Sequence, residues 1–343
     1  MSTIQSLEQI FLSLKQQTNA LTSNPLLNCF DQEALAKIDH ESGLDSFLAD
    51  KKKKILASIA AIKGPKIDFD PQLKSAYDEY SEALAYLRLK SKFTFVERVT
   101  EGSDKSPDFR IKFTGKQTNI QEFEVFAELK SMAFSDGNLN YKKAMEDGLA
   151  AQIDIIEQHK KGHSVAFGIT EVQPLLRGNK PYKIGSVKYA IETLIEKIEQ
   201  NLKGDQFTHG DTVLLIDLKQ LTLPSHFIEG AVPVFQERQY NSFMSGVQWH
   251  VALGKIGYLI FKQIEFEGKE NVDGELERKG ILIDRDWIKA IIFFDYDLAS
   301  KEPEIIGLFR SDNVSDGVMA FLSQFCDFIN DEKNSYGFKL HEK

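Results

Sequence analysis

The chain has 343 residues, of which 42% are hydrophobic and 27% are charged, and its formal net charge is −9. These proportions are typical of a globular protein that can bury one large core or two ordinary ones. The excess of acidic residues lies mostly in residues 171–343, and it argues against a protein that only clamps nucleic acid with a basic face.

Cysteine content and the N-terminus together predict a cytoplasmic protein. Cys29 and Cys326 are far apart and lack zinc-type spacing, as expected of buried thiols in a reducing compartment. The N-terminus lacks the basic and apolar regions of a signal peptide. Because no apolar run approaches the 18 or more residues of a membrane span, we expect no membrane partner.

Residues 1–65 predict a helical N-terminal segment. Two sets of apolar residues recur at helical spacing, namely Leu7, Ile10, Phe11 and Leu14, then Phe47, Leu48, Ile55, Ile59 and Ile62. A run of four lysines at 51–54 is either a solvated helix face or a contact for a phosphate backbone. The segment has more apolar residues than a solvated arm needs, so we expect it to pack on the core or on a second copy, giving a homodimer. Gly64–Pro71 predicts a linker.

Residues 72–170 predict a helix, three strands, a second helix and a fourth strand. The expected ranges are 72–90 for the first helix, 92–99, 108–113 and 122–130 for the strands, 138–160 for the second helix, and 164–169 for the last strand. On the second helix, Met145, Leu149, Ile153 and Ile156 are spaced to face a core. The short connections between the first strands favour hairpins, and the later helix favours a crossover, so we expect a mixed sheet.

Residues 171–343 predict a further α/β region. The pattern predicts a helix near 184–203, strands at 213–217, 256–261, 288–294 and 304–309, a closing helix at 315–330, and loops at 171–183 and 223–246. These strands either extend the same sheet or form a second domain.

Three chemically active residues fall at the ends of two predicted strands. Asp108 follows Pro107 and opens the second strand, whereas Glu128 and Lys130 close the third. Side chains alternate along a strand, so Glu128 and Lys130 project from one side, and a hairpin brings Asp108 alongside. Two carboxylates suit a divalent cation, and an ammonium group suits an anionic substrate.

In this order of helices and strands, Pro107, Asp108, Glu128 and Lys130 resemble the PD-(D/E)XK nuclease superfamily, the fold of many restriction and repair endonucleases. The likeness covers residues 72–170. It implies an α/β fold with a restriction-endonuclease-like mixed sheet flanked by helices. The N-terminal segment and the C-terminal extension, or second domain, would be additions to that core.

The resemblance also implies a Mg²⁺ ion, with Mn²⁺ as a substitute. Asp108 and Glu128 would bind it, together with the main-chain carbonyl of Leu129. Lys130 would orient or help deprotonate the attacking water and stabilise the developing charge on the phosphate.

Two more site residues follow from the resemblance alone. Members of the superfamily often carry a glutamate on the first helix, and Glu82 fits that place best, with Glu79 as its rival. Many carry a polar residue on the second helix that faces the site, and Gln152 matches it. Each of these residues also has a plain surface interpretation.

The expected activity is Mg²⁺-dependent hydrolysis of DNA phosphodiester bonds by a nuclease, acting as an endonuclease or an exonuclease, in restriction, repair or anti-phage defence. A metal promotes this hydrolysis in two ways. It lowers the pKa of bound water, and it neutralises the charge that develops on the phosphate. One alternative is a non-catalytic binding or assembly protein that keeps a nuclease-like core. A second alternative is the same chemistry on RNA.

The site residues have structural alternatives. Asp108 can be a turn residue after Pro107, and Glu128 and Lys130 can be an exposed strand pair. Glu124 shares a face with Glu128, where it either adds a ligand or is structural.

Asp217 and Lys219 repeat the acid-x-lysine pattern at the end of another apolar strand. They lack a preceding hairpin strand that opens with an acid, which favours Asp108, Glu128 and Lys130 as the site.

Overall fold

The computed structural model describes residues 6–17, 25–62, 70–99, 106–115, 121–132, 138–139, 141–168, 175–177, 180–181, 187–220, 235–237, 242–244, 246–261, 272–294, 305–333 and 336–339. They form an α/β protein with a mixed sheet, which confirms the predicted class. The chain divides into two compact units. Unit 1 comprises Met1–Ala83 and Asp136–Lys183, and unit 2 comprises Leu84–Ser135 and Ile184–Lys343.

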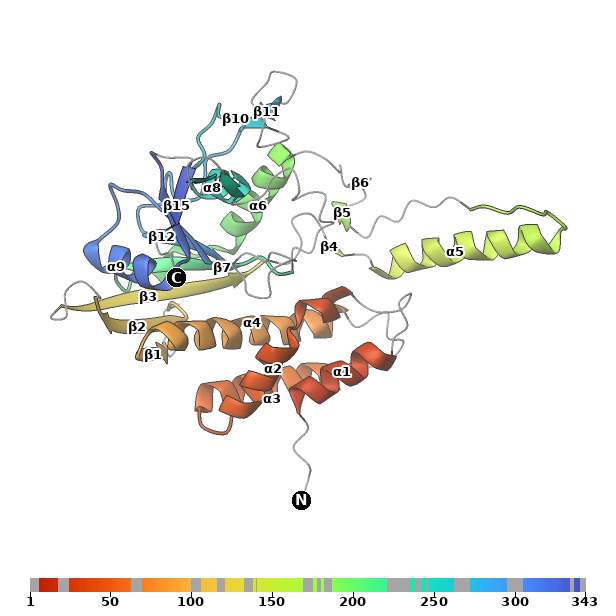
Figure 1. The fold of residues 1–343 in the computed structure, drawn as a ribbon, viewed down its shortest axis with the longest axis horizontal. Coiled ribbons are helices and arrows are strands. Elements are labelled where there is room, and N and C mark those ends of the chain that lie inside the picture. Colours follow the sequence, from red (N-terminus) through yellow and green to blue (C-terminus); the bar gives the residue numbers. More distant parts are fainter. Residues whose placement is uncertain are drawn as a thin grey trace. The chain divides into compact units, whose positions relative to one another are not determined.

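Unit 1 is mainly helical. Its elements are α1 (Leu7–Gln17), η1 (Pro25–Cys29), α2 (Gln32–Glu41), α3 (Ser46–Ala60), the first half of α4 (Asp70–Lys92), α5 (Tyr141–Lys160) and the short strands β4 (Asn138–Leu139), β5 (Leu175–Arg177) and β6 (Lys180–Pro181). Helices α1, α2 and α3 lie beside one another (Figure 1). Asp31 and Asp45 begin α2 and α3 as N-caps, because their carboxylates accept hydrogen bonds from main-chain N–H groups of the first turn.

Some of the apolar residues at helical spacing in the N-terminal segment are buried within this unit, namely Leu7, Phe11, Leu48 and Ile55. Phe30 is the centre of an aromatic cluster, with ring centroids 4.2 Å from Phe11, 5.5 Å from Tyr77 and 5.2 Å from Tyr80. The two tyrosines belong to α4, so the segment packs on the helix that follows it. These contacts account for part of its apolar surface, whereas Ile10, Leu14, Phe47, Ile59 and Ile62 are only half-buried, and the homodimer stays a prediction.

The lysine run at 51–54 is not a uniformly solvated face. Lys51 is buried, and its Nζ lies 2.7 Å from a carboxylate oxygen of Glu79 and 2.5 Å from one of Glu82. Lys52 pairs with Asp39 at 2.7 Å. Lys53 is exposed. The first two lysines therefore hold helices together rather than face solvent.

Replacing Lys51 with methionine is expected to lower the free energy of unfolding by about 2 kcal/mol, because Glu79 and Glu82 would keep their partly buried charges without a cation. The measurement is urea denaturation of the purified protein. Lys53→Met is the matched control and should change stability by less than about 0.5 kcal/mol. Equal effects of the two substitutions would contradict a structural role for Lys51.

Unit 2 contains the sheet. Its N-terminal elements are β1 (Phe95–Arg98), β2 (Phe109–Thr114), β3 (Glu122–Ser131), α6 (Val187–Asn201), η3 (Gly204–Phe207) and β7 (Thr212–Asp217). The later elements are β8 (Phe235–Glu237), β9 (Ser242–Met244), α8 (Gly246–Leu253), β10 (Leu259–Phe261), β11 (Val272–Glu275), β12 (Ala290–Phe294), β13 (Ile305–Phe309), α9 (Asp316–Phe325), β14 (Phe328–Asp331) and β15 (Tyr336–Lys339).

The strand order joins the two halves of the chain in one sheet. It runs β1-β2-β3-β7-β12-β13-β14 and continues through β15, β9 and β8. Strands β1, β2 and β3 pair antiparallel, whereas β3 with β7 and β7 with β12 pair parallel. Hairpins thus come first and a crossover later, as predicted. The C-terminal strands β7, β12 and β13 extend the same sheet, whereas β10, in the predicted strand 256–261, pairs with β11 in a separate two-stranded sheet.

Helices cover both faces of the central strands within unit 2. On one face Tyr86 of α4 stacks on Phe109, and Arg88 lies 4.8 Å from the ring of Phe294. On the other face α6 and α8 lie side by side (Figure 1) and cover a buried cluster that includes Leu214, Ile216 and Phe293.

The predicted strand at 164–169 is wrong for residues 164–168, which form no strand and expose Val165 and Phe167. The strand beside β3 is β7 instead. Every residue of β7 is buried, as a parallel strand covered on both faces requires.

The prediction that the second helix faces a core is also wrong in part. On α5, Leu149, Ile153 and Ile156 are 45%, 57% and 47% exposed, and the side chain of Met145 lies outside the described residues. The helix packed on the sheet after β3 is α6, whose apolar residues Ile191, Leu194, Ile195 and Ile198 are buried. Both helices are amphipathic, so periodicity could not distinguish them.

Other predicted boundaries differ less from those in the structure. The closing helix ends at Phe325, before residue 330, and β14 follows it. The predicted linker at 64–71 and the loops at 171–183 and 223–246 lie mostly outside the described residues. No helix in the described ranges combines the length and the apolar character that crossing a membrane requires.

His250 on α8 provides a pH-dependent term in stability. Its Nδ1 is buried without a hydrogen-bond partner, and burial lowers the pKa of this imidazole from 6.5 to about 4. Between these two values the unfolded chain binds a proton that the folded chain does not. Above pH 6.5 His250 is neutral in both states and its titration adds no cost, whereas the fold loses stability as the pH falls from 6.5 towards 4.

His250→Phe removes this titration, so the stability of the variant should fall less than that of the native protein between pH 6.5 and 4.5. The expected difference is on the order of 2 kcal/mol. Urea denaturation of both proteins across this range measures it. Parallel stability curves would show that His250 is accessible to protons in the fold.

Candidate active site

The end of β3 extends past the start of β2. The hairpin register places Phe109 opposite Ala127, and β3 continues to Ser131. Asp108 lies directly before β2, so the register brings it beside the last residues of β3. This offset leaves a stretch of β3 main chain available to side chains.

Asp108 occupies that stretch. Its Oδ2 accepts a hydrogen bond of 2.7 Å from the main-chain N–H of Leu129, and its Oδ1 forms an ion pair with Nη1 of Arg98. Asp108 therefore takes the place of a strand partner for Leu129.

The carbonyl of Leu129 faces the same edge. The main-chain N–H groups of Phe126 and Met132 donate to the neighbouring chain segment at Asp211 and Asp217, so the even-numbered residues of β3 point their main-chain groups towards β7. Because main-chain directions alternate along a strand, both main-chain groups of Leu129 point towards the β2 side, where Asp108 lies.

Glu128 is almost fully buried, at 1% exposure. Its Oε1 lies 2.6 Å from Nζ of Lys130 and accepts a hydrogen bond of 2.5 Å from Nε2 of Gln206. Lys130 also donates to Oε1 of Gln206 at 3.3 Å. The second oxygen of Glu128, Oε2, is buried without a hydrogen-bond partner. A buried carboxylate oxygen without a hydrogen-bond partner can serve as a ligand for a cation.

Burial raises the pKa of Glu128 to about 8, and the charge of Asp108 adds to the shift, while Lys130 opposes it. The two carboxylates thus lie close enough to repel each other. A divalent cation placed between them would relieve both the repulsion and the burial cost. That they share one cation stays a prediction.

Gln206 is a site residue that the sequence analysis missed. It lies on η3, shortly before β7, and reaches both Glu128 and Lys130. A polar residue facing the site was expected from the second helix, at Gln152. Gln152 has an exposed side chain on α5. The signal for Gln206 was its position before the strand that pairs with β3, and that pairing was not predicted.

Glu82 and its rival Glu79 lie on α4, where both contact Lys51. These two glutamates and Gln152 belong to unit 1, whereas Asp108, Glu128 and Lys130 belong to unit 2. The structure thus brings together the residues of the strand ends, and the role expected for Glu82 and Gln152 stays a prediction.

The sheet face next to Glu128 is exposed over β1 and β2 and carries charged residues. Arg110 pairs with Glu97 at 3.1 Å and with Glu124 at 2.6 Å, and Lys112 lies 3.7 Å from Glu124. Glu124 is therefore already neutralised by cations, which favours its structural interpretation. The exposed charges leave this side of the site open to solvent.

The similar pair Asp217 and Lys219 faces elsewhere. Asp217 lies opposite Ser131 in the register, whereas Glu128 and Lys130 lie opposite Leu214 and Ile216. Residues opposite one another share a face, so Asp217 points to the other side of the sheet. Its Oδ1 accepts a hydrogen bond of 2.9 Å from the N–H of Lys219.

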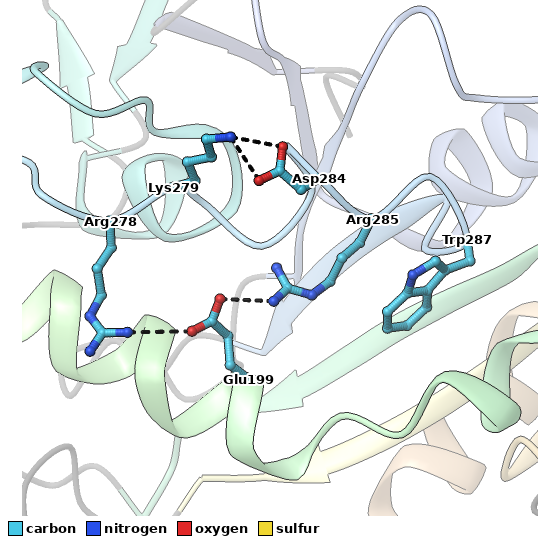
Figure 2. Close-up of a pocket in the computed structure, with 6 residues that line it drawn as sticks. All are labelled: Glu199, Arg278, Lys279, Asp284, Arg285 and Trp287. Carbon is cyan, nitrogen blue, oxygen red and sulfur yellow. Dashed lines mark hydrogen bonds and ion pairs between the residues drawn. The ribbon is translucent and has the colours of Figure 1, made fainter.

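A shallow pocket of about 460 Å³ lies elsewhere in unit 2. Figure 2 shows Glu199 between two arginines, 3.5 Å from Arg278 and 2.8 Å from Arg285. Lys279 pairs with Asp284 at 2.9 Å. Each of these charged side chains is thus already paired with one of opposite sign. Trp287 packs against Phe207, with their ring centroids 4.7 Å apart, and this contact holds the end of η3 next to Gln206.

The described residues contain no group of three or more His, Cys, Asp and Glu side chains arranged to hold a metal ion. The donors at the strand ends are two carboxylates and one main-chain carbonyl. All are hard oxygen ligands of the kind that Mg²⁺ prefers. This donor set and the unpartnered oxygen of Glu128 fit a divalent cation.

No protein-family model, curated protein or solved structure matches the chain. Membership of the PD-(D/E)XK superfamily therefore stays a prediction.

Replacing Glu128 with glutamine should raise the free energy of unfolding by about 1 kcal/mol at pH 7.5 in the presence of EDTA. The change keeps the shape of the side chain and removes a carboxyl group that burial disfavours as an anion. Urea denaturation measures the effect. Glu124→Gln, on the same strand and exposed, should not stabilise the protein. A clear loss of stability in Glu128→Gln would show that the pair with Lys130 outweighs the burial cost.

Proposed function

We propose that this protein is a divalent-metal-dependent nuclease that hydrolyses DNA phosphodiester bonds. The observation that carries the proposal is the buried Glu128 carboxylate, which has one unpartnered oxygen and lies at a strand end beside Asp108 and Lys130. Burying an acid with an unsatisfied oxygen costs stability, and a metal site is a physical reason to keep it.

Asp108 and Glu128, with the carbonyl of Leu129, would hold the metal. A bound Mg²⁺ or Mn²⁺ would lower the pKa of a water molecule and neutralise charge on the phosphate. The protein contributes a fixed set of oxygen donors, because strand pairing and the hydrogen bond from Leu129 to Asp108 set their positions.

Lys130 would face the attacked phosphate. Its ammonium group is held by Glu128 and Gln206, so little reorganisation is needed when a substrate arrives. In that position it attracts the anionic phosphate, orients the attacking water and stabilises the charge that develops during hydrolysis.

The order of elements supports a restriction-endonuclease-like core. In unit 2 the second half of α4 is followed by β1, β2, β3, then α6 and β7. This is the predicted succession of helix, three strands, helix and strand. It uses α6 and β7 rather than α5 and residues 164–169, so α5 would be an insertion in that core.

DNA remains the proposed substrate, and restriction, repair and anti-phage defence in the cytoplasm are the biological settings that such an activity suits. One observation favours the alternative of a non-catalytic binding protein. Both oxygens of Asp108 are already engaged, by Arg98 and by Leu129, and a permanently engaged carboxylate would not bind metal.

A cleavage assay with Mg²⁺ or Mn²⁺ on supercoiled plasmid, linear duplex, single-stranded DNA and RNA tests the proposal. The native protein should cut DNA. Lys130→Ala should lower the cleavage rate by about 10²–10³, because it removes a charge that stabilises the transition state. It should retain metal binding, because Lys130 is not a metal ligand. Asp108→Ala should lose metal binding and cleavage together.

Lys112→Ala is the matched control, since Lys112 is an exposed strand lysine outside the proposed metal site. Native-like rates in Lys130→Ala would refute the role given to Lys130. Cleavage of RNA but not of DNA would show that the substrate is RNA. Metal binding without cleavage of any substrate would favour the non-catalytic alternative.

A further inference from the structure

Arg98 is a cation at the candidate site that the proposed reaction has not used. It is the last residue of β1 and lies opposite Phe109 in the β1–β2 register. Its guanidinium group lies 6.0 Å from the ring of Phe109 and pairs with Oδ1 of Asp108. The side chain is 30% exposed, so it is partly accessible to solvent.

The carboxylate of Asp108 cannot keep its full ion pair with Arg98 while it also binds a metal. In the absence of a metal, the guanidinium offsets the negative charge that Asp108 and Glu128 concentrate at the strand ends. A divalent cation at these carboxylates would repel the guanidinium and compete for the same oxygen atom. Arg98 must then weaken its pair with Asp108.

A displaced guanidinium has an obvious alternative partner at such a site. Arginine carries five N–H donors in a planar fork that matches the oxygen atoms of a phosphate, and it stays charged at all physiological pH values. Because its side chain is partly exposed, Arg98 can turn towards a phosphate without unfolding the strand.

We propose that Arg98 is a counter-ion for Asp108 that a divalent cation displaces and that then binds a phosphate of the nucleic-acid substrate. This inference rests on the nuclease function proposed above and deepens it. Arg98 lowers the affinity of the empty site for metal and raises the affinity of the loaded site for substrate. Metal and substrate therefore bind cooperatively.

Arg110 provides the matched control. It lies on the adjacent strand, and its guanidinium group pairs with Glu97 and Glu124 on the exposed sheet face. It has the same charge and a similar exposure, but its ion pairs do not involve Asp108.

The first measurement is isothermal titration of the DNA-free protein with Mn²⁺. Arg98→Gln should bind Mn²⁺ about three- to tenfold more tightly than the native protein, because the competing cation is gone. Arg98→Lys keeps the charge and should stay close to the native affinity, as should Arg110→Gln. Thermal unfolding of each variant confirms that it is folded.

The second measurement is fluorescence anisotropy of a labelled DNA duplex with protein loaded with Ca²⁺. Arg98→Gln should bind the duplex at least about fivefold more weakly than the native protein, with Arg98→Lys in between and Arg110→Gln within about twofold of native. Opposite effects of one substitution on metal and on DNA are not expected of a residue that only supports the fold.

Asp108→Ala separates this inference from the function on which it rests. If the native protein shows no Mn²⁺ site that is lost in Asp108→Ala, the nuclease proposal fails and the inference fails with it. If that site exists and Arg98→Gln binds Mn²⁺ no more tightly than Arg110→Gln, the inference alone is overturned. Unchanged DNA affinity of Arg98→Gln would also overturn it, because the phosphate contact would be absent.

Discussion

The parallel pairing of β3 with β7 is the constraint on which the rest of the sheet and the candidate site depend. It joins the antiparallel hairpins before residue 132 to the strands after residue 211 in one sheet. It also covers the second edge of β3, so that Glu128 is buried between neighbouring strands rather than left on a sheet edge. The turn that leads into β7 carries Gln206 to Glu128 and Lys130. One pairing thus sets the fold, the burial of the acid and the polar contacts around it.

The candidate site is a balance of charges in which no group is simply paired with one partner. Glu128 contacts Lys130 and Gln206 through one oxygen and leaves the other without a hydrogen bond. Asp108 is held by Arg98 and by a main-chain N–H group. Such an arrangement tolerates an added cation, because the cation would satisfy the free oxygen of Glu128 and relieve its repulsion with Asp108. A site built only for stability would have avoided both costs.

The two faces of the sheet separate packing from chemistry. Phe109 and Ala127 share the face covered by the second half of α4, where Tyr86 stacks on Phe109. Glu128 and Lys130 lie on the other face, with Leu214 and Ile216 of β7. On that face the central strands are covered and the outer strands β1 and β2 expose charged side chains. The acid therefore lies where the covered part of the sheet meets the open part, so it is buried yet close to solvent.

The sequence by itself determined the local elements and the nucleus of the site. Alternation along β2 and β3, the short hairpin connection and the acids at the strand ends were enough to predict that Asp108 lies beside Glu128 and Lys130, because these contacts are set by neighbours in the chain. The mixed sheet followed from the same spacing, and the order of helices and strands suggested a nuclease-like core that remains a proposal.

Only the tertiary structure decided which strand completes the sheet after β3. Residues 164–169 and Thr212–Asp217 both have a strand-like pattern, and α5 and α6 are both amphipathic, so local pattern could not choose between them. The choice depends on burial against distant parts of the chain, where β7, all of whose residues are buried, gains more than a segment that contains glycine. The periodicity of a sequence also does not show which residues its long polar side chains contact. Gln206 reaches the site because β3 and β7, which are far apart in sequence, lie next to each other, and no repeat in the sequence records that contact.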